Sequence, residues 1–175
     1  MKVFLNPGHA LDGNPDPGAC GCGLRECDVA KSVADLVERY LVDAGVEVVG
    51  NMQDDSLYAI TCAADESDAD IFVSIHCNAF NGEAHGTETC VYPGSTRSSQ
   101  LGECIQRQIV DALGTTDRGL KDRGGLYVLK HTDMPAVLVE LAFIDNEDDA
   151  ELLRDNQDDF ARAIARGVTD YELLL

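Results

Sequence analysis

An apolar run near the end of the chain contains a single charged residue. Residues 136–144 read AVLVELAFI, in which only Glu140 is charged, and the run lies between Pro135 and Asp145. A run of this length between turn-forming residues is typical of a strand buried in an α/β sheet. An ionised glutamate there is costly to desolvate unless a cation, a metal ion or hydrogen bonds compensate its charge. Glu140 is therefore either functional, or structural at an exposed strand end or in a pair with an arginine.

Shorter apolar runs predict the remaining strands. Residues 71–75 are apolar apart from one serine and predict a second buried strand, whereas residues 87–92 alternate in character. The segment 10–25 is rich in Gly, Pro, Asp and Asn, and the segment 118–121 is polar, so both are expected to be loops. Strands are thus expected at residues 2–5, 46–49, 71–75, 87–92, 126–129 and 136–144.

Apolar residues at three- and four-residue spacing predict helices between these strands. Glycines at positions 45 and 114 follow two of these patterns and supply the left-handed residue that often ends a helix. The alternation of strands and helices predicts a single α/β domain over residues 1–175, without repeats or linkers. Helices are expected at residues 26–44, 57–64 and 101–113, with one long helix at 147–168.

Length and charge limit the classes of partner. A chain of 175 residues suits one globular domain, and its 45% apolar content argues against disorder. The 13 basic and 32 acidic side chains give a formal charge of −19, which disfavours nucleic acid or an anionic membrane surface as a partner. No segment is long and apolar enough to span a membrane, and we expect a monomer.

The first residues show no signal peptide, because the apolar stretch breaks at Asn6 and Pro7. We therefore expect one of two origins. Either the chain is made in the cytoplasm and released later, as a phage lysin is, or it is a domain excised from an exported protein.

The seven cysteines are odd in number, so they cannot all pair within the chain. Cys20, Cys22 and Cys27 cluster in the first loop, but their C-x-C-x4-C spacing matches known zinc sites poorly. The other four are scattered among apolar residues and are expected to be small buried hydrophobes. Reduced thiols are the simplest expectation for all seven.

Two of the four histidines follow predicted strands. His9 comes soon after the first strand, and His76 directly follows residues 71–75. Because ligands of open α/β sheets bind at the carboxyl ends of strands, both positions suit chemistry. Glu26 lies in the first turn of a predicted helix, where the helix dipole alone explains an anion. His85 and His131 lie in predicted loops and are expected at the surface without a role.

Two imidazoles and one carboxylate form a ligand set of catalytic zinc sites, in which water takes the fourth position. Zinc lowers the pKa of that water to roughly 7 and polarises a carbonyl group. A further glutamate such as Glu140 could then act as general base and pass the proton to a leaving nitrogen, as amide hydrolysis requires. The candidate ligands are far apart in sequence and form no compact motif, so structural explanations for each of them stay open.

Four segments together resemble the zinc-dependent N-acetylmuramoyl-L-alanine amidases of the Amidase_3 family. Their order and intervals are similar to that family across almost the whole chain, and residues 143–146 are similar as well. The resemblance rests on residues 6–9 (NPGH), 25–26 (RE), 69–79 (ADIFVSIHCNA) and 135–140 (PAVLVE).

The resemblance implies a reaction and an architecture. It implies Zn²⁺ bound by His9, Glu26 and His76, with Glu140 as the catalytic carboxylate. It also implies that the substrate is peptidoglycan, cleaved at the amide between the lactyl group of N-acetylmuramic acid and the first L-alanine of the stem peptide. The fold it implies is a mixed, mostly parallel sheet of about six strands flanked by helices.

Three more polar residues occupy family-like positions. Asn78 and Asn146 are expected near the site, where they would orient substrate, and the Arg118 guanidinium could bind a carboxylate of the stem peptide. Cys77 stands where the family more often has a small or apolar residue, and is expected to be buried. No long insertion fits between Phe80 and Leu101, so the site should be open.

Two rival functions use the same or similar residues. A zinc carboxypeptidase or deacylase would need the same ligand set, and release of peptide from intact glycan would separate the amidase from it. A non-catalytic peptidoglycan-binding module would lack a ligand or Glu140, whereas this chain has all of them.

Overall fold

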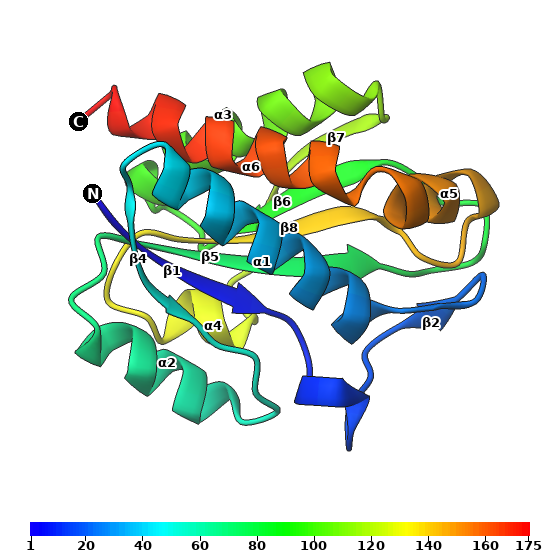
Figure 1. The fold of residues 1–175 in the computed structure, drawn as a ribbon, viewed down its shortest axis with the longest axis horizontal. Helices are drawn as coiled ribbons and strands as arrows, with labels where there is room; N and C mark the ends of the chain where they lie inside the picture. Colours follow the sequence, from blue (N-terminus) through cyan, green and yellow to red (C-terminus); the bar gives the residue numbers. More distant parts are fainter.

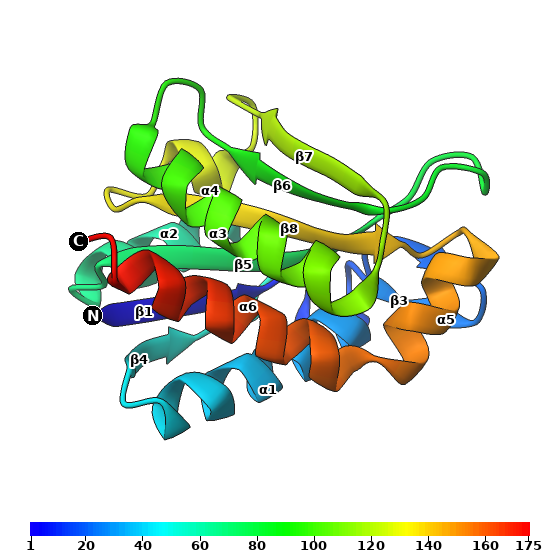
Figure 2. The same cartoon turned by 90° about the horizontal axis from the view of Figure 1, so that it is seen from above.

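A six-stranded sheet runs through the middle of the protein in the computed structural model, which describes all 175 residues. The strand order is β4-β1-β5-β8-β6-β7, which can be followed in Figure 2. The strands are β1 (Lys2–Pro7), β4 (Glu47–Asn51), β5 (Ile71–Asn78), β6 (Thr87–Val91), β7 (Asp117–Asp122) and β8 (Ala136–Phe143).

The sheet is mixed, and its reversed strands matter for the site. Strands β4, β1, β5 and β8 are parallel, β6 is antiparallel to β8, and β7 is parallel to β6. The carboxyl ends of β1, β5 and β8 therefore meet the amino ends of β6 and β7 at one edge. This arrangement confirms the expected α/β class with a mostly parallel sheet.

Helices cover the two faces of the sheet unequally (Figure 1). Helices α1 (Glu26–Asp43), α3 (Thr96–Leu113) and α6 (Gln157–Glu172) lie on one side, which we call the covered face. The shorter α2 (Leu57–Glu66) and α4 (Tyr127–Lys130) lie on the other side, which we call the open face. Helix α5 (Glu147–Asp155) follows β8, and none of the helices combines the length and apolar character needed to cross a bilayer.

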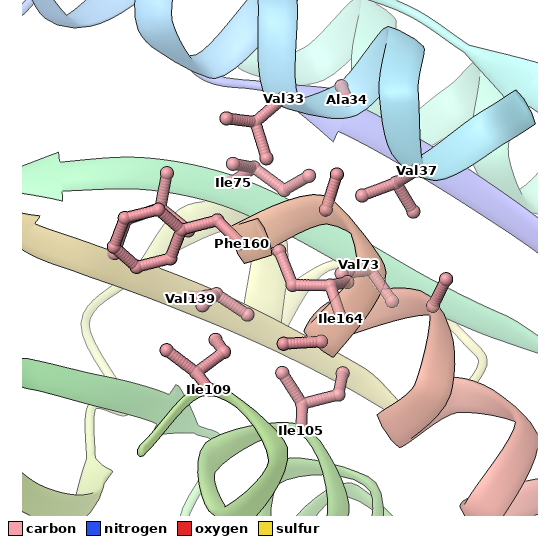
Figure 3. Packing of buried hydrophobic residues seen from close by; sticks show 14 of the residues in the cluster. Val33, Ala34, Val37, Val73, Ile75, Ile105, Ile109, Val139, Phe160 and Ile164 are labelled. Carbon is pink, nitrogen blue, oxygen red and sulfur yellow. The ribbon is translucent and has the colours of Figure 1, made fainter. Parts of the chain in front are cut away.

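The main core lies on the covered face and contains 31 buried residues. Figure 3 shows Phe160 and Ile164 of α6, Ile105 of α3 and Val139 of β8 gathered in this core. Alternation along each strand sends every second side chain into this core. Burial of this much apolar surface is the main stabilising contribution to the domain.

A smaller cluster of nine buried residues lies on the open face. It includes Phe72 of β5 and Leu138 of β8, which pack against Ile60 of α2 and Val128 of α4. These helices stop short of the carboxyl ends of the strands, so His76, four residues after Phe72, and Glu140, two residues after Leu138, are only partly covered on the same face.

Three predicted elements are wrong. Residues 118–121 belong to the edge strand β7 and not to a loop; an edge strand meets solvent and needs no apolar alternation. Residues 127–129, in the predicted strand 126–129, belong to the short helix α4, and Leu126 is its N-cap. A four-residue apolar run has no diagnostic period. The predicted helix 147–168 is two helices, because Asn156 adopts a non-helical backbone (φ −118°, ψ 27°) between α5 and α6.

The first loop contains more structure than expected. A 3₁₀ turn (Leu11–Gly13) and a small hairpin of β2 (Cys20–Gly21) and β3 (Leu24–Arg25) lie within it. Their segments are too short to show a period in the sequence. The other predicted helices and strands are confirmed, with shifted ends.

Candidate active site

Adjacent parallel strands bring the two strand-end histidines together. His9 follows β1 and His76 lies near the end of β5, and these strands are hydrogen-bonded neighbours. Their rings lie edge to face with centroids 5.1 Å apart. Glu26 is the first residue of α1, and the predicted cluster of His9, Glu26 and His76 has one candidate ligand atom from each residue within 4.8 Å of the others.

The buried Glu26 carboxylate lies between the two imidazoles. Its Oε2 is 2.9 Å from His9 Nε2, and its Oε1 is 2.8 Å from His76 Nδ1. Each oxygen also accepts a backbone N–H, from Ala19 at 2.8 Å and from Cys77 at 3.0 Å. Burial opposes the charged form, but the hydrogen bonds from His76 and His9 outweigh it and hold the pKa of Glu26 well below its usual range.

Asp16 holds the other side of the His9 ring. Its Oδ2 lies 2.8 Å from His9 Nδ1, and its Oδ1 accepts the Gly18 N–H at 3.0 Å. Burial lowers the pKa of His9, but hydrogen bonds with Glu26 and Asp16 outweigh it and raise the pKa to about 9. A carboxylate on the second ring nitrogen is the usual partner of a metal-binding histidine. Sequence reasoning missed Asp16, because nothing distinguishes it from the other acids of its loop.

Two glycines let the backbone approach the ligand cluster. A Cβ on Gly8 would lie 2.3 Å from His76 Cε1, and a Cβ on Gly18 would lie 2.4 Å from His9 Cδ2. His9 itself has a left-handed backbone (φ 66°), which is uncommon for a residue with a side chain. The loop is therefore shaped around the histidines at the expense of local strain.

The donor set fits a zinc ion. Two imidazoles and a carboxylate that converge within 4.8 Å match the ligands of catalytic zinc sites. Both histidine side chains are about one-fifth exposed, so the cluster is accessible from the open face. The thiol of Cys77 packs in the main core on the opposite face, and burial raises its pKa well above the usual value, so it does not compete for this site.

Glu140 lies directly beside the ligand cluster. It is the cross-strand partner of His76 in the β5–β8 pair, so both side chains are on the open face. Its Oε2 is shielded from solvent and has no hydrogen-bond partner, and Glu140 forms no ion pair. Burial raises the pKa of Glu140 to about 7, and the charges of Glu26 and Glu88 add to this while His76 opposes it. The structural explanation by an arginine partner is therefore not supported.

A second carboxylate, Glu88, stands on the other side of Glu140. The two residues are cross-strand partners in the antiparallel β6–β8 pair. Arg118 of β7 donates from Nε to Glu88 Oε2 at 2.8 Å, and its guanidinium lies 4.8 Å from the ring centre of Phe143. Sequence reasoning missed Glu88, since only the strand order places it beside Glu140.

The two predicted asparagines make local contacts. Asn78 Oδ1 accepts the Ala79 N–H at 3.0 Å. Asn146 caps α5 by accepting the Asp149 N–H at 3.2 Å, and its Nδ2 donates to Gly82 O at 3.1 Å. Asn146 thus has a structural role as a helix cap. Contact of Asn78 or Asn146 with substrate stays a prediction.

A pocket of about 280 Å³ adjoins the two histidines on the open face. Its apolar wall comes from α2, α4 and β8 and includes Leu57, Tyr127 and Leu138. Its polar wall includes Asp54 and Asp55, and no lysine or arginine lines it. The site thus has an acidic and apolar wall toward α2. On the opposite side, toward β7, lies Arg118. His85 and His131 do not line this pocket and are exposed as expected, although the His131 ring packs against Tyr127.

An α/β domain with a His–Glu–His cluster that could hold a metal ion, and with an unpaired glutamate beside it, has the features of a hydrolase active site. Comparison with known proteins defines the family. A family model described as N-acetylmuramoyl-L-alanine amidase matches residues 3–170. The chain therefore belongs to this family, as its sequence motifs indicate.

Individual relatives agree with this assignment. The N-acetylmuramoyl-L-alanine amidase LytC of Bacillus subtilis is 38% identical over 179 residues, covering 97% of this chain and 35% of LytC. The endolysin of Bacillus phage SPP1 is 37% identical over 94% of this chain and 62% of its own length. The crystal structure of an N-acetylmuramoyl-L-alanine amidase from Clostridium difficile 630 superposes with a TM-score of 0.89 at 31% identity, covering 98% of this chain and 96% of that one. The chain thus spans about a third of LytC and less than two thirds of the endolysin.

Proposed function

We propose that this domain hydrolyses the amide between the lactyl group of N-acetylmuramic acid and L-alanine in peptidoglycan, and that it acts on the cell wall. Family membership supports the substrate and the bond. The observation that supports the mechanism is Glu140, a shielded carboxylate without a partner beside a convergent His–Glu–His cluster.

His9, Glu26 and His76 would hold one zinc ion. When bound, zinc supplies a Lewis acid that polarises the amide carbonyl and makes water nucleophilic near neutral pH. The ionised Glu26 contributes the negative charge of the ligand set, and backbone N–H groups keep both of its oxygens in place. Asp16 fixes the orientation of the His9 ring.

Glu140 is the general base in this proposal. Its Oε2 accepts a proton from the attacking water as the new C–O bond forms, and then donates that proton to the alanine nitrogen as the C–N bond breaks. Burial raises the pKa of Glu140 in the metal-free protein, and a zinc ion beside it would favour the carboxylate, the form that accepts the proton from water. Burial without a hydrogen-bond partner keeps the carboxylate available to the water.

Three further residues are proposed to contact substrate. Arg118 lies on the side of the site toward β7 and would bind a carboxylate of the stem peptide. Asn78 and Asn146 lie near the carboxyl ends of β5 and β8 and would orient the peptide. The open face offers room for a polymer, because no helix covers the carboxyl half of these strands.

Mass analysis of digested muropeptides tests this function. The purified protein should contain about one zinc per chain. It should release L-alanine-terminated peptides from intact glycan, and a chelator should abolish that release until zinc is restored. His76→Ala should lose both the metal and the activity. Release of single terminal residues instead would indicate a carboxypeptidase, and full activity without metal would overturn the mechanism.

A further inference from the structure

Three basic side chains lie close together at one edge of this acidic protein, in a segment that also contains Asp117 and Asp122. Three of its 13 lysines and arginines, Arg118, Lys121 and Arg123, fall within six positions at and just after strand β7. Lys121 is the cross-strand partner of Cys90, which belongs to the open-face cluster, so Lys121 lies on the open face. Arg118 and Arg123 reach the same face, because both approach the carboxylate of Glu88.

The two guanidinium groups share one buried carboxylate. Glu88 is only 5% exposed; its Oε2 meets Arg118 Nε at 2.8 Å, and its Oε1 lies 3.8 Å from Arg123 Nη2. Neither arginine pairs with any other carboxylate, so within this group of three side chains one positive charge is in excess. The side chains of Arg118 and Arg123 are 35% and 53% exposed, so both can reach a ligand.

Arg118 keeps hydrogen-bonding capacity for a ligand. Its Nε is bonded to Glu88 and its Nη1 donates to His85 O at 3.4 Å, whereas its Nη2 has no protein partner. The ring of Phe143 supports the guanidinium at 4.8 Å. Because Arg118 pairs with Glu88, it does not pair with the neighbouring Glu140, whose carboxylate stays free of an arginine partner.

The distance between Glu140 and Arg118 matches the position of one carboxyl group in the stem peptide. Neighbouring strands are about 4.8 Å apart, so β6 and β7 place Glu88 and Arg118 roughly 5 and 10 Å from Glu140 across the sheet. An extended peptide advances about 3.5 Å per residue. The residue after L-alanine in a stem peptide is a D-glutamate joined through its γ-carboxyl group, so its α-carboxyl group branches off within this range.

We propose that Arg118 and Arg123, held in place by Glu88, bind the free α-carboxylate of that second stem residue and select it over its amide. The inference rests on the proposed amidase function and adds a determinant of specificity. Planar guanidinium groups bind a carboxylate through paired charged hydrogen bonds, which a neutral carboxamide cannot match. The acidic pocket wall at Asp54 and Asp55 would repel the same carboxylate, so the peptide runs from Glu140 toward β7.

Two synthetic substrates that differ in one group test the proposal. They are N-acetylmuramoyl-L-alanyl-D-glutamate with its γ-carboxyl group blocked as an amide, and the isoglutamine counterpart with the same γ-block, so that only the α-carboxyl group differs. The wild-type enzyme should show a kcat/KM about 10- to 100-fold higher for the acid than for the amide, the range expected for one or two charged hydrogen bonds. Arg123→Gln should lower kcat/KM for the acid by a similar factor, mainly through KM, and reduce the acid-to-amide ratio toward one.

Arg107→Gln is the matched control. Arg107 is similarly exposed but pairs with Asp170 between α3 and α6, on the covered face. Its substitution should leave the ratio unchanged. Equal wild-type rates for acid and amide, or an equal loss on both substrates in Arg123→Gln, would overturn the carboxylate site while the amidase function stands. Failure of the wild-type enzyme to cut either substrate before L-alanine would instead refute the amidase function itself.

Discussion

On the covered face of the sheet, strands β5 and β8 bury Ile75 and Val139 under three helices. On the open face the same strands carry His76, which lines the pocket, and its cross-strand partner Glu140. One residue along a strand therefore separates a core position from a reactive one. The covered face holds 31 buried residues and the open face nine, so most of the apolar stabilisation comes from one side.

The difference shows how the domain tolerates an unfavourable site. A shielded carboxylate without a partner and a histidine with a left-handed backbone are both destabilising. The short helices of the open face leave the two histidines partly exposed beside the shielded Glu140, and the large core on the other face supplies the compensating stability. Substitutions on the open face should thus change chemistry, and substitutions on the covered face should change folding.

The largest effect on the open face, with the metal retained, is expected for Glu140→Gln. Loss of the general base should lower kcat by about 10²- to 10⁴-fold. Zinc content should stay the same, because Glu140 is not a proposed ligand. The melting temperature should rise slightly, since a neutral amide is easier to bury than an unpaired carboxylate. Residual activity above a tenth of wild type, measured by muropeptide release, would exclude Glu140 as the base.

Phe160→Ala is the corresponding change on the covered face. Phe160 is fully buried between α6 and the sheet, and its truncation should reduce the free energy of unfolding by about 3–5 kcal/mol. The kcat of the folded fraction should be unchanged. Denaturant unfolding measures the loss of stability, and kinetics of the zinc-loaded variant measure kcat. A large fall in kcat with little loss of stability would show that the two faces do not have separate roles.

The candidate residues of the open face could be predicted from the sequence where they lie in or just after an apolar run. His9 and His76 each follow an apolar run, and Glu140 interrupts one, so their types and places are visible without a structure. The sheet order brought them together, and the family motifs indicated which glutamate completes the cluster. The zinc ligation and the role of Glu140 remain predictions that the geometry supports.

Residues that act across strands could not be predicted. Glu88 faces Glu140 only because β6 reverses direction beside β8, and chain direction is not encoded in hydrophobic alternation. Strand β7, which carries Arg118, is polar because it lies at the sheet edge, so it has the sequence pattern of a loop. Asp16 is one acid among several in a loop whose path is set by contacts with His9 and Gly18.

Asp16→Asn should have a moderate effect on the open face. An asparagine can still contact the His9 ring but does not bring the charge of the carboxylate. Zinc affinity should fall by about 10- to 100-fold, the range found for such partners of metal-binding histidines. Competition with a chromogenic chelator measures this change. The matched control is Asp12→Asn in the same loop, whose side chain makes no contact with the cluster; equal losses in both variants would show a general charge effect.

The smallest expected effect is a pH dependence of the metal-free protein. The folded-state pKa of His9 is raised from 6.5 to about 9, so its contribution to stability is complete below pH 6.5 and is lost as the pH rises through 9. Glu26, whose pKa is lowered, contributes above pH 4.5 and does not change in this window. The melting temperature of the metal-free protein should therefore fall by several degrees between pH 6 and pH 9.5.

Zinc should reverse this trend, because the ion binds the neutral imidazole and must displace the His9 proton at lower pH. The stabilisation produced by zinc should thus grow as the pH rises from 6 to 9, measured as the difference between melting temperatures with and without the metal. Glu140, whose pKa is raised to about 7, also titrates between pH 6 and pH 9.5, so His9→Ala serves as the reference. Without metal, the melting temperature of His9→Ala should depend less on pH than that of the wild type. If wild type and His9→Ala show the same pH profile without metal, then the pairing of His9 with Glu26 and Asp16 does not stabilise the open face.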